Sequence, residues 1–344
     1  MQQRMLAQGP LHRTDGILSE AGYALTPIKE YDRGRVKAPR HRIKEWDYYL
    51  VMNERSALAI TISDNGYMGL DSLSFIDFEA SAQRTVSRMN WLPLGKRGLP
   101  ATSLSGVTRA VGNNYEFTFR VEGGQRQLYG HMYDFGGEKQ PLLFDIVLQE
   151  PRQDSMVIVI PFDKKPHHFY YNRKINCLPA DGRVIYQDRE YLFSPAASFG
   201  TLDWGRGVWP YADTWYWGSA SGIIAGRAFG MNIGHGFGDT SRATENMLFY
   251  RGTASKLAQV HFEVPQENGR ENYLLPWQVR DDAGRLSLTF TPILDRAAEI
   301  NALILGSSQH QVFGQFSGQA VLDDGTRLEV RDVMGFLEKV KNRW

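Results

Sequence analysis

Cysteine is almost missing from this chain of 344 residues. Cys177 stands alone, which excludes an internal disulfide framework and leaves no cysteine pair for zinc. Long apolar runs are missing too: Met156–Phe162 is among the longest and falls far short of the ~20 residues that span a bilayer. The opening MQQRMLAQGP lacks the apolar core of a signal peptide. We therefore expect a soluble, cytoplasmic protein without a transmembrane segment.

An excess of one charge is also lacking. The chain has 39 basic and 38 acidic side chains, a formal net charge of +1. Because a nucleic-acid-binding surface needs a basic face or stripe, we expect no nucleic-acid partner. The one basic cluster, Arg33–Arg42, is interpreted as a solvated segment, with a phosphate contact as the alternative. Composition does not define the oligomeric state.

Helical periodicity is scarce, whereas apolar residues recur at every second position, which is typical of half-buried strands. Segments with this alternation include 115–122, 142–148, 258–264, 286–290 and 314–322. Turn signals separate many of them, such as Gly123-Gly124, Asp64–Gly66, Ala180–Gly182, Asp281–Gly284 and Asp323–Gly325. Residues 333–340 fit either a helix or a bulged strand. The pattern predicts an antiparallel all-β protein.

Three parts are expected along the chain. Residues 1–42 are polar and rich in proline and glycine, which indicates a surface segment. Regular structure should begin at Ile43, and one small barrel needs only ~8 strands, so the remaining chain is too long for a single barrel. We divide it into a first β unit, 43–194, and a second, 195–344.

Aromatic residues are concentrated in one stretch, Phe199–Tyr250, which should open and line the second unit. Trp204, Trp209, Trp215 and Trp217 make up half of the eight tryptophans. Charged residues lie among these rings, and a ligand pocket explains rings beside charges better than simple core filling does. The glycines at 222–238 fit a bent sheet wall beside a ligand, or a tightly curled barrel without one.

The motifs of this stretch resemble a bacterial family of domains of unknown function. They are DWGRGVWPY at 203–211, WYWG at 215–218, GFGDT at 236–240, TENMLFY at 244–250 and NRW at 342–344. More remotely, the sequence is similar to two-domain lipocalin-like proteins that include carotenoid 1,2-hydratase (hydroxyneurosporene synthase). That resemblance implies two tandem lipocalin-like (calycin-type) antiparallel β-barrel units and an apolar ligand. Asp203 matches an aspartate of that group, whereas Trp204 replaces its histidine.

We expect the chain to bind a hydrophobic or amphipathic small molecule, lipid- or isoprenoid-like, with or without hydratase, isomerase or cyclase chemistry. The alternative is a non-catalytic lipid-binding or structural protein. The candidate catalytic acids are Asp203, Asp239 and Glu245, because an acid must protonate carbon in such chemistry. The candidate ligand-binding residues are Trp204, Arg206, Trp209, Trp215, Trp217, Asn246 and Tyr250.

Structural roles compete with each of these assignments. The tryptophans could be core, Arg206 could pair with Asp203 or Asp213, and Asp239 could cap a turn. Gly218–Gly222 resembles a nucleophile elbow but has alanine at its centre, and Gly234–Gly238 lacks the lysine of a P-loop. The histidine-containing groups each offer only two ligands. We expect no metal and no cofactor.

Overall fold

The fold is taken from a computed structural model that describes residues 2–138, 140–162, 165–302 and 305–343. Within these ranges strands predominate, and the helical segments are two short 3₁₀ turns, η1 (Arg33–Arg35) and η2 (Arg40–Arg42). Neither of these described helical segments has the length or apolar character needed to cross a membrane. The predicted all-β class is confirmed. Trp344, the last residue of the NRW motif, lies outside the described ranges.

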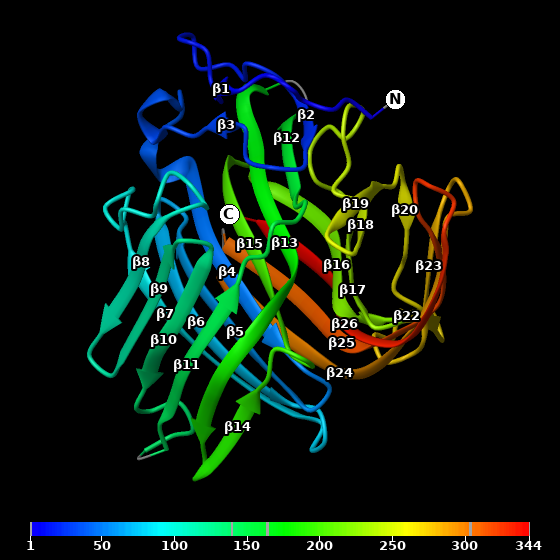
Figure 1. Ribbon diagram of the computed structural model, residues 1–344. Coiled ribbons are helices and arrows are strands. Elements are labelled where there is room, and N and C mark those ends of the chain that lie inside the picture. The colour runs from blue at the N-terminus through cyan, green and yellow to red at the C-terminus, as the bar shows by residue number, and fades with distance from the viewer. Residues whose placement is uncertain (1, 139, 163–164, 303–304, 344) are drawn as a thin grey trace.

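The first sheet is antiparallel and strongly curled (Figure 1). Its main path runs β7 (Ala82–Trp91), β6 (Met68–Asp77), β5 (Ser56–Asp64), β4 (Ile43–Met52), β15 (Phe199–Val208), β13 (Lys165–Tyr186), β11 (Leu142–Gln149), β10 (Gln125–Met132), β9 (Tyr115–Glu122) and β8 (Gly106–Gly112). Strands that pair off this path are β2 (Gly22–Ala24), β12 (Met156–Phe162) and β14 (Arg189–Phe193). Near the N-terminus, β1 (Gly9–Pro10) pairs with β3 (Lys29–Glu30).

The second sheet is also antiparallel and curled. Its order is β19 (Thr253–Lys256), β18 (Met247–Tyr250), β17 (Arg227–His235), β16 (Ala212–Ile224), β26 (Arg327–Arg343), β25 (Leu305–Val321), β24 (Leu286–Ala302), β23 (Trp277–Asp281) and β20 (Val260–His261). A small hairpin joins β21 (Gln266–Glu267) to β22 (Arg270–Glu271). Residues 333–340 are part of β26, so the strand interpretation of that segment is confirmed and the helical one is wrong.

One turn prediction was wrong. Gly123-Gly124, Asp64–Gly66 and Asp281–Gly284 do connect neighbouring strands, but Ala180–Gly182 lies inside the continuous strand β13. Gly182 has φ 143° there, and a Cβ atom at this position would lie 2.2 Å from the carbonyl oxygen of Asp145. The glycine is therefore needed for the close approach of β11, not for a turn.

The change of sheet falls later in the chain than the sequence suggested. The expected boundary at 194/195 precedes β15, but β15 pairs with β13 and β4 in the first sheet. Hydrogen bonding passes to the second sheet only at β16, which pairs with β17 and β26. The N-terminal segment also contributes to the structure, because Met5 and Leu11 are buried and β2 pairs with β12.

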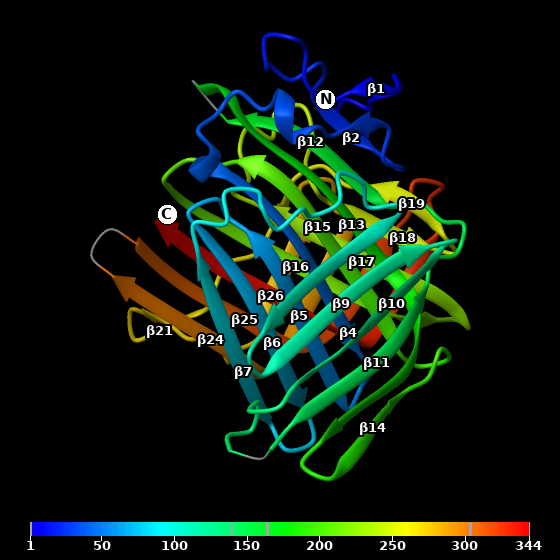
Figure 2. The ribbon, with the colours of Figure 1, turned by 90° about the vertical axis from the view of Figure 1, so that its left-hand side faces the viewer.

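Three apolar cores follow from this arrangement. One fills the inside of the first sheet and another the inside of the second, and a third lies between the sheets. Figures 1 and 2 show β13 and β15 of the first sheet beside β16 and β17 of the second, and these strands are in contact. Alternation along each strand sends one side chain into a barrel and the next between the sheets. This alternation decides which candidate functional side chains point into a barrel and which lie between the two sheets.

Candidate functional site between the two sheets

Asp203 lies on the face of β15 that is turned toward the second sheet. Its neighbours in sequence, Leu202 and Trp204, belong to the core inside the first sheet. The Asp203 Oδ1 atom accepts hydrogen bonds from Asn172 Nδ2 at 2.5 Å and from Trp46 Nε1 at 3.2 Å. Its Oδ2 atom lies 3.7 Å from Lys174 Nζ, and its side chain keeps 11% of its surface exposed. The carboxylate is thus held firmly while one side stays accessible.

Lys174 connects Asp203 to the second sheet. Its Nζ atom lies 3.2 Å from both carboxylate oxygens of Glu245, a residue of the loop between β17 and β18. The same ammonium donates to the hydroxyl of Tyr170 at 3.1 Å and lies 4.5 Å from the ring centroid of Trp217. Burial raises the pKa of Glu245, Lys174 opposes that shift, and the charge of Asp203 reinforces it. Two carboxylates therefore share one buried cation.

Aromatic rings from both sheets enclose these charges. Trp209, in the connection between β15 and β16, has its ring 5.2 Å from that of Trp215, 5.0 Å from Tyr170 and 6.1 Å from Trp46. Phe237 stacks on Tyr170 at 5.7 Å. Trp46 and Trp215 are only half-buried, so the aromatic wall reaches solvent there. Rings that face a cation stabilise it through their quadrupoles.

Glu338 adds a third buried carboxyl group from β26. Its Oε2 atom accepts hydrogen bonds from Gln309 Nε2 at 3.1 Å and Gln311 Nε2 at 3.3 Å. Burial raises the pKa of Glu338 to about 7. The charge of Arg296 and the hydrogen bonds from Gln309 and Trp215 oppose this shift, whereas the negative charge of Asp203 adds to it. A carboxyl group with this pKa carries its proton in a large fraction of molecules near neutrality, as a general acid must.

We call these residues the inter-sheet cluster. Its members are Trp46, Tyr48, Tyr170, Asn172, Lys174, Asp203, Trp209, Trp215, Trp217, Phe237, Glu245, Gln311 and Glu338. Among the described residues no group of three or more His, Cys, Asp or Glu side chains is arranged to hold a metal ion.

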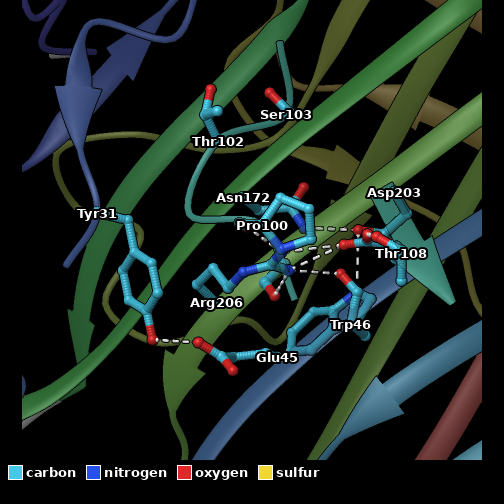
Figure 3. A network of polar contacts seen from close by, with 12 residues as sticks. Tyr31, Glu45, Trp46, Pro100, Thr102, Ser103, Thr108, Asn172, Asp203 and Arg206 are labelled. Carbon is cyan, nitrogen blue, oxygen red and sulfur yellow. Dashed lines mark hydrogen bonds and ion pairs between the residues drawn. The ribbon is translucent and has the colours of Figure 1, made fainter. Parts of the chain in front are cut away.

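Trp204 and Arg206 do not join this cluster. Both point into the first barrel from the opposite face of β15, where the Arg206 guanidinium lies 4.1 Å from the Trp204 ring centroid. Figure 3 shows Arg206 within a network of polar contacts with neighbouring strands and with Pro100. Its ion pair is with Asp47 at 3.1 Å, so the predicted partners Asp203 and Asp213 were wrong. Alternation along one strand separates Arg206 from Asp203.

Three further predicted residues have structural contacts instead. Asp239 Oδ1 accepts from the backbone N–H of Ser241 at 2.9 Å, which is the turn-capping arrangement. Asn246 bridges the backbones of Gly234 and Ala258 at 2.7 Å each. Tyr250 packs against the core inside the second sheet. Of the predicted residues, the structure brings together Asp203, Glu245, Trp209, Trp215 and Trp217.

Lys174, Tyr170 and Glu338 were not predicted. Tyr170, Asn172 and Lys174 occupy alternate positions of β13, so a polar stripe on an otherwise buried strand was the available signal. Glu338 had no such signal, because its segment was read as either a helix or a strand. Only the pairing of β26 with β16, which sets Glu338 opposite Trp217, reveals its place.

Comparisons with known proteins agree with this architecture. Residues 2–344 match a family described as Domain of unknown function (DUF2804). A crystal structure from Nitrosomonas europaea, assigned as AttH, aligns with a TM-score of 0.56 and 14% identity over 92% of this chain and 98% of that one. Kievitone hydratase from Nectria haematococca aligns with a TM-score of 0.54 and 11% identity over 97% and 98%. These likenesses show the two-barrel fold. No curated protein sequence gives a significant match.

Proposed function

The chain belongs to the DUF2804 family, and we propose that it binds a hydrophobic or amphipathic small molecule in the inter-sheet cluster and transfers a proton to and from it. The reaction class would be hydration, dehydration or isomerisation of a carbon–carbon double bond. One of the structurally similar proteins is a hydratase, which supports this class without identifying the substrate.

The observation that carries the proposal is the placement of Lys174, Asp203, Glu245 and Glu338 within one aromatic enclosure. Burying ionisable groups is expensive, and well-packed apolar residues often stabilise a protein as much or more. Here three carboxyl groups and one ammonium gather between two sheets that already share an extensive apolar core. Perturbed ionisable groups in such surroundings are typical of functional sites.

The residues suit distinct roles. Glu338, with a pKa of about 7, would donate a proton to a double-bond carbon and leave a carbocation. The rings of Trp215 and Trp217 would stabilise that cation, each contact contributing ~0.5–2 kcal/mol. Asp203 accepts hydrogen bonds and stays partly exposed, so it suits the base that takes the proton from incoming water or from a neighbouring carbon. Either route returns one proton to the protein and balances the reaction.

Deuterium incorporation tests the chemistry without a known substrate. The protein is incubated in D₂O with a panel of unsaturated isoprenoid alcohols, isoprenoid carboxylates and prenylated phenols, and each compound is analysed by mass spectrometry. Protonation of carbon introduces deuterium whether hydration or isomerisation follows. We expect incorporation with at least one compound, and a loss of ~10²–10⁴ in its rate in Glu338→Gln and in Asp203→Asn.

Glu329→Gln is the matched control, because Glu329 lies on the same strand but is exposed. It should keep the full rate of incorporation. Binding of a panel compound, seen as a change in tryptophan fluorescence, without deuterium incorporation would support the non-catalytic alternative. If no compound of the panel shows either binding or incorporation, the proposal is refuted.

A further inference from the structure

We propose that the chain has a second small-molecule site, which takes an amphipathic monocarboxylate. The site is a pocket of about 360 Å³ between β4 and β15 of the first sheet and β16 and β26 of the second. That volume lies at the small end of the range of ligand pockets. Apolar side chains from both sheets line it, namely Leu50, Met52, Phe199, Val333 and Met334.

The pocket is distinct from the inter-sheet cluster. Thr201 lines it two residues before Asp203 on β15, and Ser219 lines it two residues after Trp217 on β16. The rings of Tyr48 and Trp217, in edge contact at 5.9 Å and both buried, belong to the cluster and do not line the pocket. None of the charged cluster residues lines it either. The inference is therefore independent of the proposed function.

Three hydroxyl groups give the pocket a polar side. Ser219 Oγ accepts a hydrogen bond from Asn176 Nδ2 at 2.8 Å, and Ser221 Oγ accepts one from the backbone N–H of Cys177 at 3.1 Å. The hydroxyl of Thr201 makes no hydrogen bond to any described residue, although Thr201 is 5% exposed. These groups can donate to a ligand oxygen.

A bulge in β26 presents Arg331 at the rim of the pocket. Pairing with β25 shifts between Phe316 and Gly318, so Arg331 and Asp332 both lie opposite Ser317. Asp332 has φ 51°, an unfavourable conformation for a non-glycine residue. Hydrogen bonds of 2.9 Å join its carboxylate and its backbone N–H to the Ser317 hydroxyl. Bulges commonly re-aim side chains in this way.

A second bulge supports the pocket from behind, through the hydrogen bond between Cys177 and the lining residue Ser221. Cys177 of β13 has φ 56° and lies where the pairing of β13 with β15 shifts. Gly230 allows this approach, since a Cβ atom there would lie 2.7 Å from Cys177 Sγ. Strained non-glycine residues persist only where their surroundings hold them, and they concentrate at binding sites. Asp332 lines this pocket, and Cys177 lies behind it, with its backbone N–H donating to the lining residue Ser221.

The charges at the rim define the ligand. The guanidinium of Arg331 makes no hydrogen bond or ion pair with any residue that the structure describes, so it can form a two-pronged contact with a carboxylate. Glu54 and Asp332 also line the pocket, where the Asp332 carboxylate already accepts a hydrogen bond from the Ser317 hydroxyl, and both would repel a second negative charge. A monocarboxylate with an apolar chain satisfies both conditions, because the chain can pack on Leu50, Met52 and Phe199.

Decanoate is a suitable probe. Titration calorimetry should show saturable binding, and protein labelled with ¹³C at the methionine methyl groups should show shifts of Met52 and Met334. Arg331→Gln should weaken decanoate binding by about 10-fold or more while leaving the affinity for decanol unchanged. Arg327→Gln removes the same charge from the same strand outside the pocket and should leave both affinities unchanged.

A pocket-filling variant gives an independent test. Ala197 is exposed and lines the pocket, so Ala197→Trp should abolish decanoate binding while leaving the midpoint of urea unfolding unchanged. Absence of saturable decanoate binding would overturn the inference. So would equal decanoate affinity in wild type and Arg331→Gln, or shifts confined to Met247, which packs between the sheets outside the pocket.

Discussion

Lys174 and Glu245 join the two sheets through an ion pair in which both side chains are only 1% exposed. One partner comes from a strand of the first sheet and the other from a loop of the second. The ammonium also lies 3.7 Å from Asp203, so it compensates two carboxylates at once. Removing it would leave these negative charges buried without their cation.

Lys174→Met should therefore destabilise the protein strongly. Removal of one partner from a buried pair typically costs ~3–5 kcal/mol, and urea unfolding at neutral pH would measure the change. Arg183→Met is the control, since it breaks the exposed pair with Glu190 and should cost no more than ~1 kcal/mol. Equal losses in the two variants would show that the Lys174 pair has no special electrostatic role.

Glu338 should make stability depend on pH. Its pKa is about 7 in the folded protein against an ordinary value of 4.5, so the folded state binds its proton more tightly. The stabilising contribution is full below pH 4.5, is lost as pH rises to about 7, and stays lost above it. As the pH rises from 4.5 to above 7, the free energy of unfolding of Glu338→Gln should increase by roughly 3 kcal/mol relative to that of wild type.

Denaturant unfolding of wild type and Glu338→Gln at a series of pH values from 4.5 to 8 would measure this difference. Subtraction removes the contribution of other groups, including Asp213, whose pKa burial also raises, to about 6. A difference that does not change across the series would contradict the assignment of a perturbed pKa to Glu338.

Gly205→Ala should disturb the inter-sheet cluster by displacing the indole ring of Trp46. A Cβ atom at this position would lie 2.0 Å from a ring carbon of Trp46, so the indole would have to move. Its hydrogen bond to Asp203 would be lost with that movement. Overpacking of this kind costs ~1–3 kcal/mol, which urea unfolding would detect. An alanine variant with unchanged stability and unchanged ligand binding would show that Trp46 has no fixed role.

Arg206→Gln should affect folding without affecting the cluster. The variant leaves the buried carboxylate of Asp47 without its cation, and the expected loss is ~3–5 kcal/mol. Under conditions where the variant is fully folded, deuterium incorporation and fluorescence titration should match those of wild type. Arg109→Gln, which breaks an exposed pair with Glu116, serves as the control for stability. Loss of ligand binding in folded Arg206→Gln would contradict the placement of Arg206 outside the cluster.

Local patterns in the sequence were sufficient for the fold class. Alternation around Tyr115–Glu122 and the Gly123-Gly124 turn describe a hairpin completely, because a hairpin depends on neighbouring residues. The alternation also implied that Trp204 and Arg206 share one face of a strand and Asp203 the other. We nevertheless expected all three at one site, since their proximity in sequence suggested proximity in space.

The assignment of strands to sheets and the composition of the inter-sheet cluster depend on contacts between segments that are distant in sequence. β15 lies between β4 and β13, and nothing near Phe199–Val208 shows that this strand belongs to the first sheet. Lys174 and Glu245 meet only because the two sheets pack against each other through β13, β15, β16 and β17. Trp215 and Trp217 are among the predicted site residues that the structure brings together, and they were noticed because their motif is locally distinctive. Glu338 lies in an ordinary amphipathic strand and was not noticed.

The position of β26 has a consequence for how the chain folds. This strand comes last in sequence, but it lies between β16 and β25 in the middle of the second sheet. Until it is inserted, the strands on its two sides have no shared ladder, and the third carboxyl group of the cluster is missing. Such long-range pairing makes folding slow. During synthesis the second sheet would therefore remain open until β26 has left the ribosome, and the inter-sheet cluster could not assemble before then.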